Sequence, residues 1–146
     1  MFKEKYKSLT SIVSALFIIA VVLFLIFFKI IIISGQSMSP TYHDKQVILI
    51  SKVYSQLNRN DVIVCTYNNM EIIKRIVGCP GDIIELKDGY VYRNSVKLSY
   101  TYDGTDEKKY TLSDDEYFVI GDNYNASTDS RVFGPIKNNA IIGRAI

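Results

Sequence analysis

The chain has 146 residues, with 17 basic against 15 acidic side chains and a formal net charge of +2 at pH 7. This balance excludes the strong basic excess that is typical of nucleic-acid-binding proteins. The length suits one domain with its own core, since about a hundred residues remain once a membrane anchor is subtracted. The sequence therefore predicts a single small domain that does not bind nucleic acid.

The first 33 residues have the pattern of a membrane anchor. Residues 1–10 contain three lysines and one glutamate, and residues 11–33 are apolar apart from two serines and Lys29. At about 1.5 Å per residue, a helix of residues 11–33 is roughly 34 Å long and crosses a hydrocarbon core of about 30 Å. Lys29 can extend its ammonium group to the membrane interface. By the positive-inside rule, residues 34–146 are predicted to lie outside the cytoplasm.

A removable secretory signal peptide is the alternative interpretation of this segment. Such a peptide has an apolar stretch of about 7–15 residues, followed by a small-x-small cleavage site. Here the apolar stretch is longer, and it ends in Ile30–Ile33 followed by Ser-Gly-Gln. We therefore expect a membrane anchor that is retained.

Residues 34–146 have the pattern of an all-β domain, because short apolar segments alternate with turn residues and no segment keeps a helical period. Asn68-Asn69, Asp88-Gly89 and Asn94-Ser95 are predicted to be tight turns, since Asp, Asn and Gly tolerate left-handed backbone angles. Tyr102–Lys109 is polar and is predicted to be an exposed loop. The predicted strands are Gln46–Ser51, Asp61–Tyr67, Glu71–Gly78, Asp82–Leu86, Gly89–Arg93, Val96–Tyr100, Tyr117–Gly121 and Ala140–Ile146.

Cys65 and Cys79 raise the question of a disulfide. In a hairpin that turns at Asn68-Asn69, Cys65 lies opposite a residue near Ile73, whereas Cys79 lies beyond the start of the other strand. A bond between the two sulfur atoms would require the backbone to move. We therefore expect two unpaired thiols that pack as small apolar side chains.

Ser37 is the first candidate for chemistry, because it lies four residues after the apolar run and close to the expected membrane surface. A serine needs a neighbouring base to act as a nucleophile. The chain has one histidine, His43, so a Ser-His-Asp triad must use it. Lys74 is the alternative base, because it lies among apolar residues and burial would keep its amine neutral. The residues alone leave both bases open.

The segment Gly121–Arg131 is rich in Asp, Asn, Gly and Ser. Such a composition is typical of a turn whose side chains bond to their own backbone. Alternatively, the carboxylates of Asp122 and Asp129 form a buried ionic network with Arg131 beside a site. The composition does not decide between the two interpretations.

Three segments resemble the motifs of the bacterial type I signal peptidases, which are membrane-anchored serine proteases with a Ser-Lys dyad. Ser37–Thr41 resembles the nucleophile motif S-M-x-P-T, and Lys74–Asp82 resembles the lysine motif K-R-x-x-G-x-P-G-D. Gly121–Asn123 and Ser127–Arg131 resemble the third motif, G-D-N followed by S-x-D-S-R. The motifs occur in the family's order, and the resemblance covers nearly the whole chain. It implies an all-β domain of coiled antiparallel sheets behind one transmembrane helix.

The resemblance also implies roles for individual residues. Ser37 matches the nucleophile, and Lys74 matches the general base. No cofactor or metal is implied. The supporting roles fall to Ser127, which orients the lysine, to the pairs Asp129–Arg131 and Asp122–Arg75, and to the substrate-pocket residues Gly35, Met38 and Ile73.

Two departures from the family's motifs bear on the mechanism. Position 35 is glycine, as in the short Gram-positive members. Other members have a serine at this position, and its hydroxyl helps to hold the oxyanion. The Ser37 amide then supplies one oxyanion donor, and the second donor is left open. Residues 124–126 read Tyr-Asn-Ala where the family usually has Arg-Asp-Asn, so the salt bridge of that Arg and Asp cannot form.

The implied function is cleavage of exported precursor proteins after small-x-small sequences, on the outer face of the cytoplasmic membrane. The implied partners are these precursors and membrane lipid. An alternative is a pilus-assembly factor that acts by binding or by processing dedicated pilin precursors. Self-cleaving repressors also use a Ser-Lys pair, but they need an N-terminal helix-turn-helix, and this chain has an apolar segment there.

Overall fold

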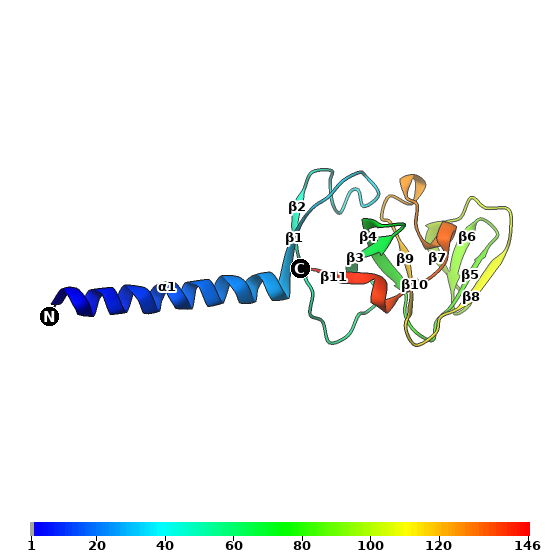
Figure 1. Ribbon diagram of the computed structural model, residues 1–146. Coiled ribbons are helices and arrows are strands. Elements are labelled where there is room, and N and C mark those ends of the chain that lie inside the picture. The colour runs from blue at the N-terminus through cyan, green and yellow to red at the C-terminus, as the bar shows by residue number, and fades with distance from the viewer. Residues whose placement is uncertain (1) are drawn as a thin grey trace.

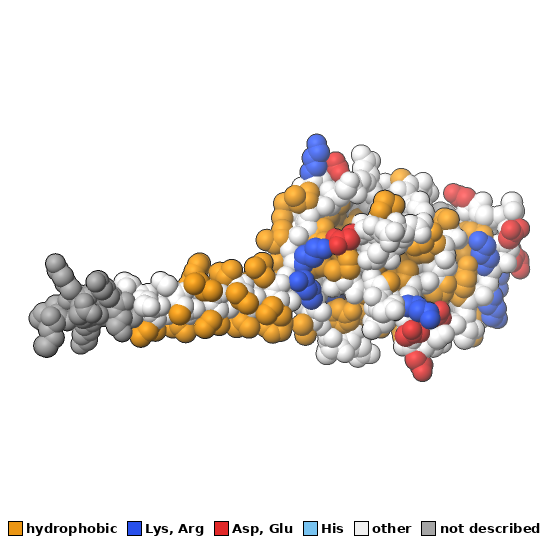
Figure 2. All heavy atoms as spheres, in the orientation of Figure 1, with side chains coloured by type: hydrophobic (Ala, Val, Ile, Leu, Met, Phe, Trp, Pro, Cys, Tyr) orange, Lys and Arg blue, Asp and Glu red, His pale blue; other side chains and the backbone are white. Residues whose placement is uncertain are grey.

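The computed structural model describes the backbone of residues 2–146 and the side chains from Thr10 onward. A long helix, α1 (Phe2–Phe27), projects from a β domain (Figure 1). Its segment Thr10–Phe27 has the length and composition to cross a membrane, since 18 residues of helix span about 27 Å. The apolar side chains of this segment are exposed around the helix (Figure 2), as expected for a surface that contacts lipid.

The helix ends at Phe27, so the expected continuation to Ile33 is wrong. Residues Phe28–Ile32 form strand β1, which pairs in antiparallel register with β2 (Val47–Ser51). An apolar run of this kind fits a helix or a strand by its pattern, and isoleucine favours strands. The pairing with β2 therefore decides the conformation, and the sequence pattern alone did not show it.

The helix and the β domain are joined without a linker. The last carbonyl groups of a helix have no partner within it. Lys52 satisfies two of them, because its backbone N–H donates to Phe27 O at 2.8 Å and its Nζ donates to Leu25 O at 2.9 Å. Lys29 was expected to reach the membrane interface from the helix, but it lies in β1 and forms an ion pair with Glu71.

The described residues contain eleven strands in two antiparallel sheets (Figure 1). The larger sheet has the order β1-β2-β11-β3-β4-β9-β10, and the smaller has the order β7-β6-β5-β8. This confirms the expected all-β class. The remaining strands are β3 (Val62–Tyr67), β4 (Met70–Gly78), β5 (Ile83–Lys87), β6 (Tyr90–Arg93), β7 (Val96–Thr101), β8 (Lys108–Thr111), β9 (Glu116–Ile120), β10 (Ile136–Lys137) and β11 (Ile141–Ala145).

The three predicted tight turns are confirmed. Asn68-Asn69, Asp88-Gly89 and Asn94-Ser95 each join two paired strands, and both residues of each turn have positive φ, between 49° and 76°. Two successive residues with positive φ define the type I′ turn, whose twist matches that of the flanking strands. Local turn chemistry thus sets the register of the β3–β4, β5–β6 and β6–β7 hairpins.

Strand β8 lies partly within the segment that was predicted to be an exposed loop, Tyr102–Lys109. It pairs with β5 at the edge of the smaller sheet. Charged side chains are common on an edge strand because one edge of the strand faces solvent. The polar composition of this segment was therefore interpreted as a loop. The two-residue strand β10 was also not predicted.

Both cysteines are free, as expected. Cys65 in β3 lies opposite Ile72 in β4, and it is buried. Burial raises the pKa of the Cys65 thiol to about 12. Cys65 therefore behaves as a small apolar side chain in the core.

Three clusters of buried apolar side chains form the core. One packs the smaller sheet against β9, and a second lies beneath β3 and β11. The third supports the loop that follows β1, and it consists of Ile33, Met38, Ile48, Ile50, Val62, Val64 and Ile73. The loop that carries Ser37 therefore rests on the core through Ile33 and Met38.

Candidate active site

Ser37 lies in the loop between β1 and β2, and the third motif holds this loop in place. The backbone N–H of Asn123 donates to Ser37 O at 2.9 Å, and its side-chain amide donates to Gln36 O at 3.1 Å. Within the loop, Tyr42 N–H donates to Met38 O. Segments more than eighty residues apart in sequence therefore fix the position of Ser37.

Lys74 lies in β4 and faces Ser37. Lys74 Nζ is 2.9 Å from Ser37 Oγ, and it donates to the carbonyl of Ile73 at 2.9 Å. Lys74 is 3% exposed, and burial lowers the pKa of its amine, although the negative charge of Asp129 opposes the shift. A buried lysine with a lowered pKa provides a neutral amine that can accept the serine proton.

We predict that activity rises with pH as Lys74 loses its proton. Only the neutral amine can accept a proton, so activity is low below the Lys74 pKa and reaches a plateau above it. Because burial lowers this pKa, the midpoint of the rise lies below the value of about 10.4 for an ordinary lysine. The measurement is kcat/KM against pH with a soluble peptide substrate. A midpoint at or above the ordinary lysine value would contradict the assignment of Lys74 as base.

His43, the other candidate base, is exposed in the turn before β2. Its backbone N–H and carbonyl bond to Gln46, which closes that turn. The group beside Ser37 Oγ is Lys74. The geometry thus favours the Ser-Lys arrangement over the Ser-His-Asp triad, which the sequence had left open.

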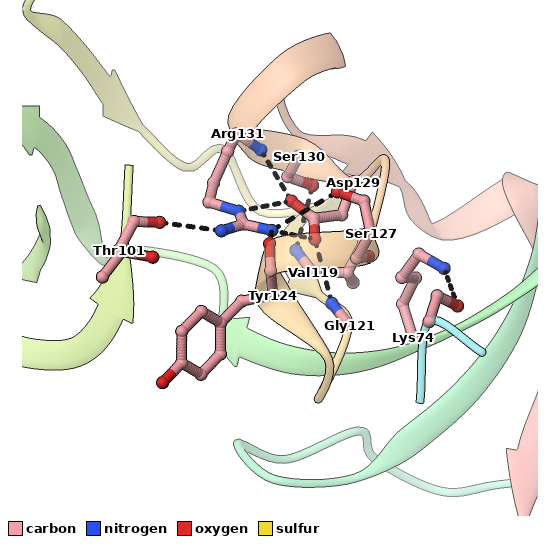
Figure 3. Close-up of polar contacts among 10 residues, drawn as sticks. Lys74, Thr101, Val119, Gly121, Tyr124, Ser127, Asp129, Ser130 and Arg131 are labelled. Atoms are coloured by element: carbon pink, nitrogen blue, oxygen red, sulfur yellow. Dashed lines mark hydrogen bonds and ion pairs between the residues drawn. The ribbon is translucent and has the colours of Figure 1, made fainter. Parts of the chain in front are cut away.

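Ser127 does not make the hydrogen bond to Lys74 that the resemblance implies. Its Oγ is buried and has no hydrogen-bond partner among the described residues. Figure 3 shows Ser127 between the Asp129–Arg131 pair and Lys74. In this structure Lys74 Nζ is instead satisfied by Ser37 and by the carbonyl of Ile73.

Asp129 and Arg131 form the buried ionic pair that was expected beside the site (Figure 3). The two guanidinium donors bond to the two carboxylate oxygens, each at 2.8 Å. Asp129 Oδ2 also accepts from Gly121 N–H at 3.0 Å. Arg131 donates further to the carbonyls of Thr101 and Tyr124, each at 2.7 Å. A fully bonded pair of this kind keeps Gly121 and the rest of the third motif in place.

Asp122 and Arg75 form a second two-point ion pair, also as expected, with contacts of 2.7 and 2.6 Å. Arg75 follows Lys74 in β4, so strand alternation sends the two basic side chains to opposite faces. Burial raises the pKa of Asp122, but hydrogen bonds from Arg75 and Thr41 outweigh it, so the pKa lies below the ordinary aspartate value. This pair joins the nucleophile loop, the lysine strand and the third motif.

A cavity of about 140 Å³ opens beside Ser37 and Lys74. Of the three predicted pocket residues, Ile73 lines it, whereas Met38 is buried in the core beneath the loop and Gly35 does not line it. Sequence reasoning missed the other lining residues on one wall because they fell within the presumed membrane helix. The lining residues are Ile31, Ile32, Ile33, Ser34, Ser37, Val64, Glu71, Ile72, Ile73 and Lys74.

Gly35 has φ of +95°, a backbone conformation that glycine adopts at no steric cost. Its N–H donates to Asp44 Oδ1 at 2.8 Å. A Cβ at this position would meet no atom within 4 Å. The Gly35 amide is therefore engaged with Asp44, and the Ser37 amide remains the expected oxyanion donor.

Ser37 and Lys74 thus meet in the arrangement of Ser-Lys hydrolases, on an all-β domain that follows an apolar helix. Comparison with known proteins identifies the family. Residues 6–146 match the family described as signal peptidase, peptidase S26. The chain belongs to this family, and its class is therefore that of the serine peptidases known as type I signal peptidases.

Individual relatives agree with this assignment. Signal peptidase I of Bacillus amyloliquefaciens is 37% identical over 117 residues, which cover 68% of this chain and 63% of the relative. Signal peptidase I U of Bacillus subtilis (strain 168) is 34% identical over 150 residues, which cover 88% of this chain and 80% of the relative. A crystal structure of a signal peptidase I from Enterococcus faecalis V583 has a TM-score of 0.51 and 29% identity, covering 63% of this chain and 98% of that chain.

Proposed function

We propose that this protein is a membrane-anchored endopeptidase that removes signal peptides from exported precursors, with Ser37 as nucleophile and Lys74 as general base. The observation that carries the proposal is the 2.9 Å distance between Lys74 Nζ and Ser37 Oγ. It is supported by the burial of Lys74, which lowers the pKa of its amine. Membership of the signal peptidase family supplies the substrate class.

The proposed reaction has two steps. Lys74 takes the proton of the Ser37 hydroxyl while Oγ bonds to the carbon of the scissile carbonyl, and the Ser37 amide holds the resulting oxyanion. The carbon–nitrogen bond then breaks, and Lys74 returns the proton to the leaving amine. In the second step Lys74 deprotonates a water molecule, whose oxygen bonds to the acyl carbon. The bond from that carbon to Ser37 Oγ then breaks, Lys74 returns the proton to Oγ, and the signal peptide leaves with a new carboxylate.

Two free strand edges flank the cavity and support binding of an extended substrate. Strand β1 pairs on one side with β2 and lies at the end of the larger sheet. Strand β4 pairs with β9 only from Arg75 onward, so Met70–Lys74 keeps one edge free within the described chain. An extended peptide adds to such an edge through its main chain. The small cavity between the edges then admits small side chains and excludes large ones, as a small-x-small sequence requires.

We infer that the domain lies on the outer face of the cytoplasmic membrane, with the N-terminal lysines in the cytoplasm. Ile30 and Ile32 in β1 are 61% and 67% exposed, a few residues beyond the end of α1. Exposed isoleucines so close to the span support contact with lipid. Protease added to intact cells should digest the β domain, and full protection of the domain would contradict this orientation.

The direct test is incubation of the detergent-solubilised protein with purified precursors, followed by mass determination of the new N-termini. The expected result is a single cut after a small-x-small sequence. The precursor set should include pilin precursors, because a dedicated processing role would show as cleavage of these alone. Cleavage after large residues, or no cleavage of any precursor, would overturn the proposal.

A further inference from the structure

An ion pair joins two strands that are not neighbours in the larger sheet. Lys29 lies in β1 and Glu71 lies in β4, and three strands separate them in the sheet order. Lys29 Nζ is nevertheless 2.5 Å from Glu71 Oε1. The pair therefore bridges the space between the free edge of β1 and the free part of β4.

The bridge stands at one end of the cavity beside the dyad. Lys29 lies two residues before Ile31, which lines the cavity together with Ile32 and Ile33. Glu71 also lines the cavity, three residues before Lys74 and hence about 10 Å from it along the strand. The dyad and Glu71 therefore line the same cavity, and Lys29 contacts it through Glu71.

The ion pair lies on the side of the cavity that is nearer to the membrane anchor. Lys29 is two residues beyond the end of α1 at Phe27. Figure 2 shows basic and acidic side chains meeting where the apolar helix joins the domain. A precursor whose apolar signal helix lies in the same membrane must enter the groove from this side. The residues between that helix and the cleavage site therefore pass the ion pair.

We propose that Lys29 and Glu71 form a charged gate that selects the substrate residues about four and five positions before the cut. This inference rests on the proposed function. The side chains of the pair are 36% and 44% exposed, and a half-exposed ion pair is weak enough for a peptide to displace. With both charges present, the gate favours neutral residues, because a charged substrate residue meets one like charge as well as one opposite charge.

The test uses single neutralisations with opposite expected effects. Lys29→Gln leaves Glu71 unpaired, so kcat/KM should rise for peptides with lysine at those two positions and fall for peptides with glutamate. Glu71→Gln should produce the reverse preference. We expect the lysine-to-glutamate ratio of kcat/KM to change about fivefold or more in each variant, in opposite directions. The exchange Lys29→Glu with Glu71→Lys should restore the preference for neutral residues.

A matched control is the pair Lys109–Glu85 on the smaller sheet, whose charged atoms are 3.4 Å apart and whose side chains are 62% and 18% exposed. Neutralising Lys109 or Glu85 should leave the ratio unchanged. A merely structural role of Lys29 and Glu71 would lower cleavage of all peptides equally, and that result would overturn the gate.

Peptide affinity for the Ser37→Ala variant provides a readout that does not need cleavage. The same opposite shifts in Kd are expected when Lys29→Gln or Glu71→Gln is added to Ser37→Ala. If the wild-type protein cleaves no precursor, the proposed function fails, but this binding measurement still decides the gate. Unchanged Kd ratios would overturn it.

Discussion

Replacing Lys74 with methionine should abolish cleavage and at the same time stabilise the fold. Without a base, Ser37 keeps its proton, and a loss of at least about a thousandfold in kcat/KM is expected. Lys74→Arg should be equally inactive, because an arginine does not lose its proton. Ser37→Ala should match these losses, and the double variant should be no worse than either single one, since the two residues act as a unit.

The stability effect follows from the sign of the Lys74 pKa shift. Burial lowers this pKa in the folded protein, so the unfolded chain binds the proton more tightly. The resulting cost to folding is fully present below the folded-state pKa, and it disappears as the pH rises through the ordinary lysine value of about 10.4. Lys74→Met removes this cost, so the denaturant midpoint at neutral pH should increase.

The measurements are precursor cleavage and denaturant unfolding at pH 7 and near pH 10. The gain in stability should be larger at pH 7 than near pH 10. A Lys74→Met protein that retained cleavage would overturn the assignment of the base. A variant that was inactive and also less stable than wild type would contradict the predicted cost of burying the Lys74 amine.

The sequence predicted the elements whose signals are local. The three type I′ turns were visible as Asn-Asn, Asp-Gly and Asn-Ser pairs, and they fix the hairpins that contain β3, β4, β5, β6 and β7. Strand alternation correctly separated Lys74 from Arg75. The ion pairs Asp129–Arg131 and Asp122–Arg75 were expected from the motifs.

What the sequence did not predict depends on contacts between distant segments. Phe28–Ile32 carries no polar alternation, so only its pairing with β2 shows that it is a strand. That strand and the residue after it then supply one wall of the cavity, which is why Ile31–Ile33 were missed as site residues. The missing bond between Ser127 and Lys74 is also a tertiary outcome, because motif spacing does not specify where a hydroxyl group points.

Gly121→Ala should inactivate the protein, although Gly121 has no side chain and takes no part in the reaction. A Cβ at this position would lie 2.2 Å from Ser127 Oγ and 2.5 Å from the carbonyl oxygen of Ser37. Real Cβ contacts are never so short, so the alanine must displace the backbone of the nucleophile or the turn that carries Ser127. A shift of about 1 Å at a reacting group can cost about a hundredfold in rate.

We therefore expect Gly121→Ala to lower kcat/KM about a hundredfold or more, and to lower the free energy of unfolding by about 1–3 kcal/mol through overpacking. The matched control is Gly143→Ala, because a Cβ there would lie 2.5 Å from the carbonyl oxygen of Ser51, in the sheet rather than in the nucleophile loop. Both variants meet a backbone oxygen at the same distance, so both should be destabilised. Only Gly121→Ala should lose activity per folded molecule, since only Gly121 contacts the backbone of Ser37. Equal losses of activity in the two folded variants would show that the third motif does not position the nucleophile.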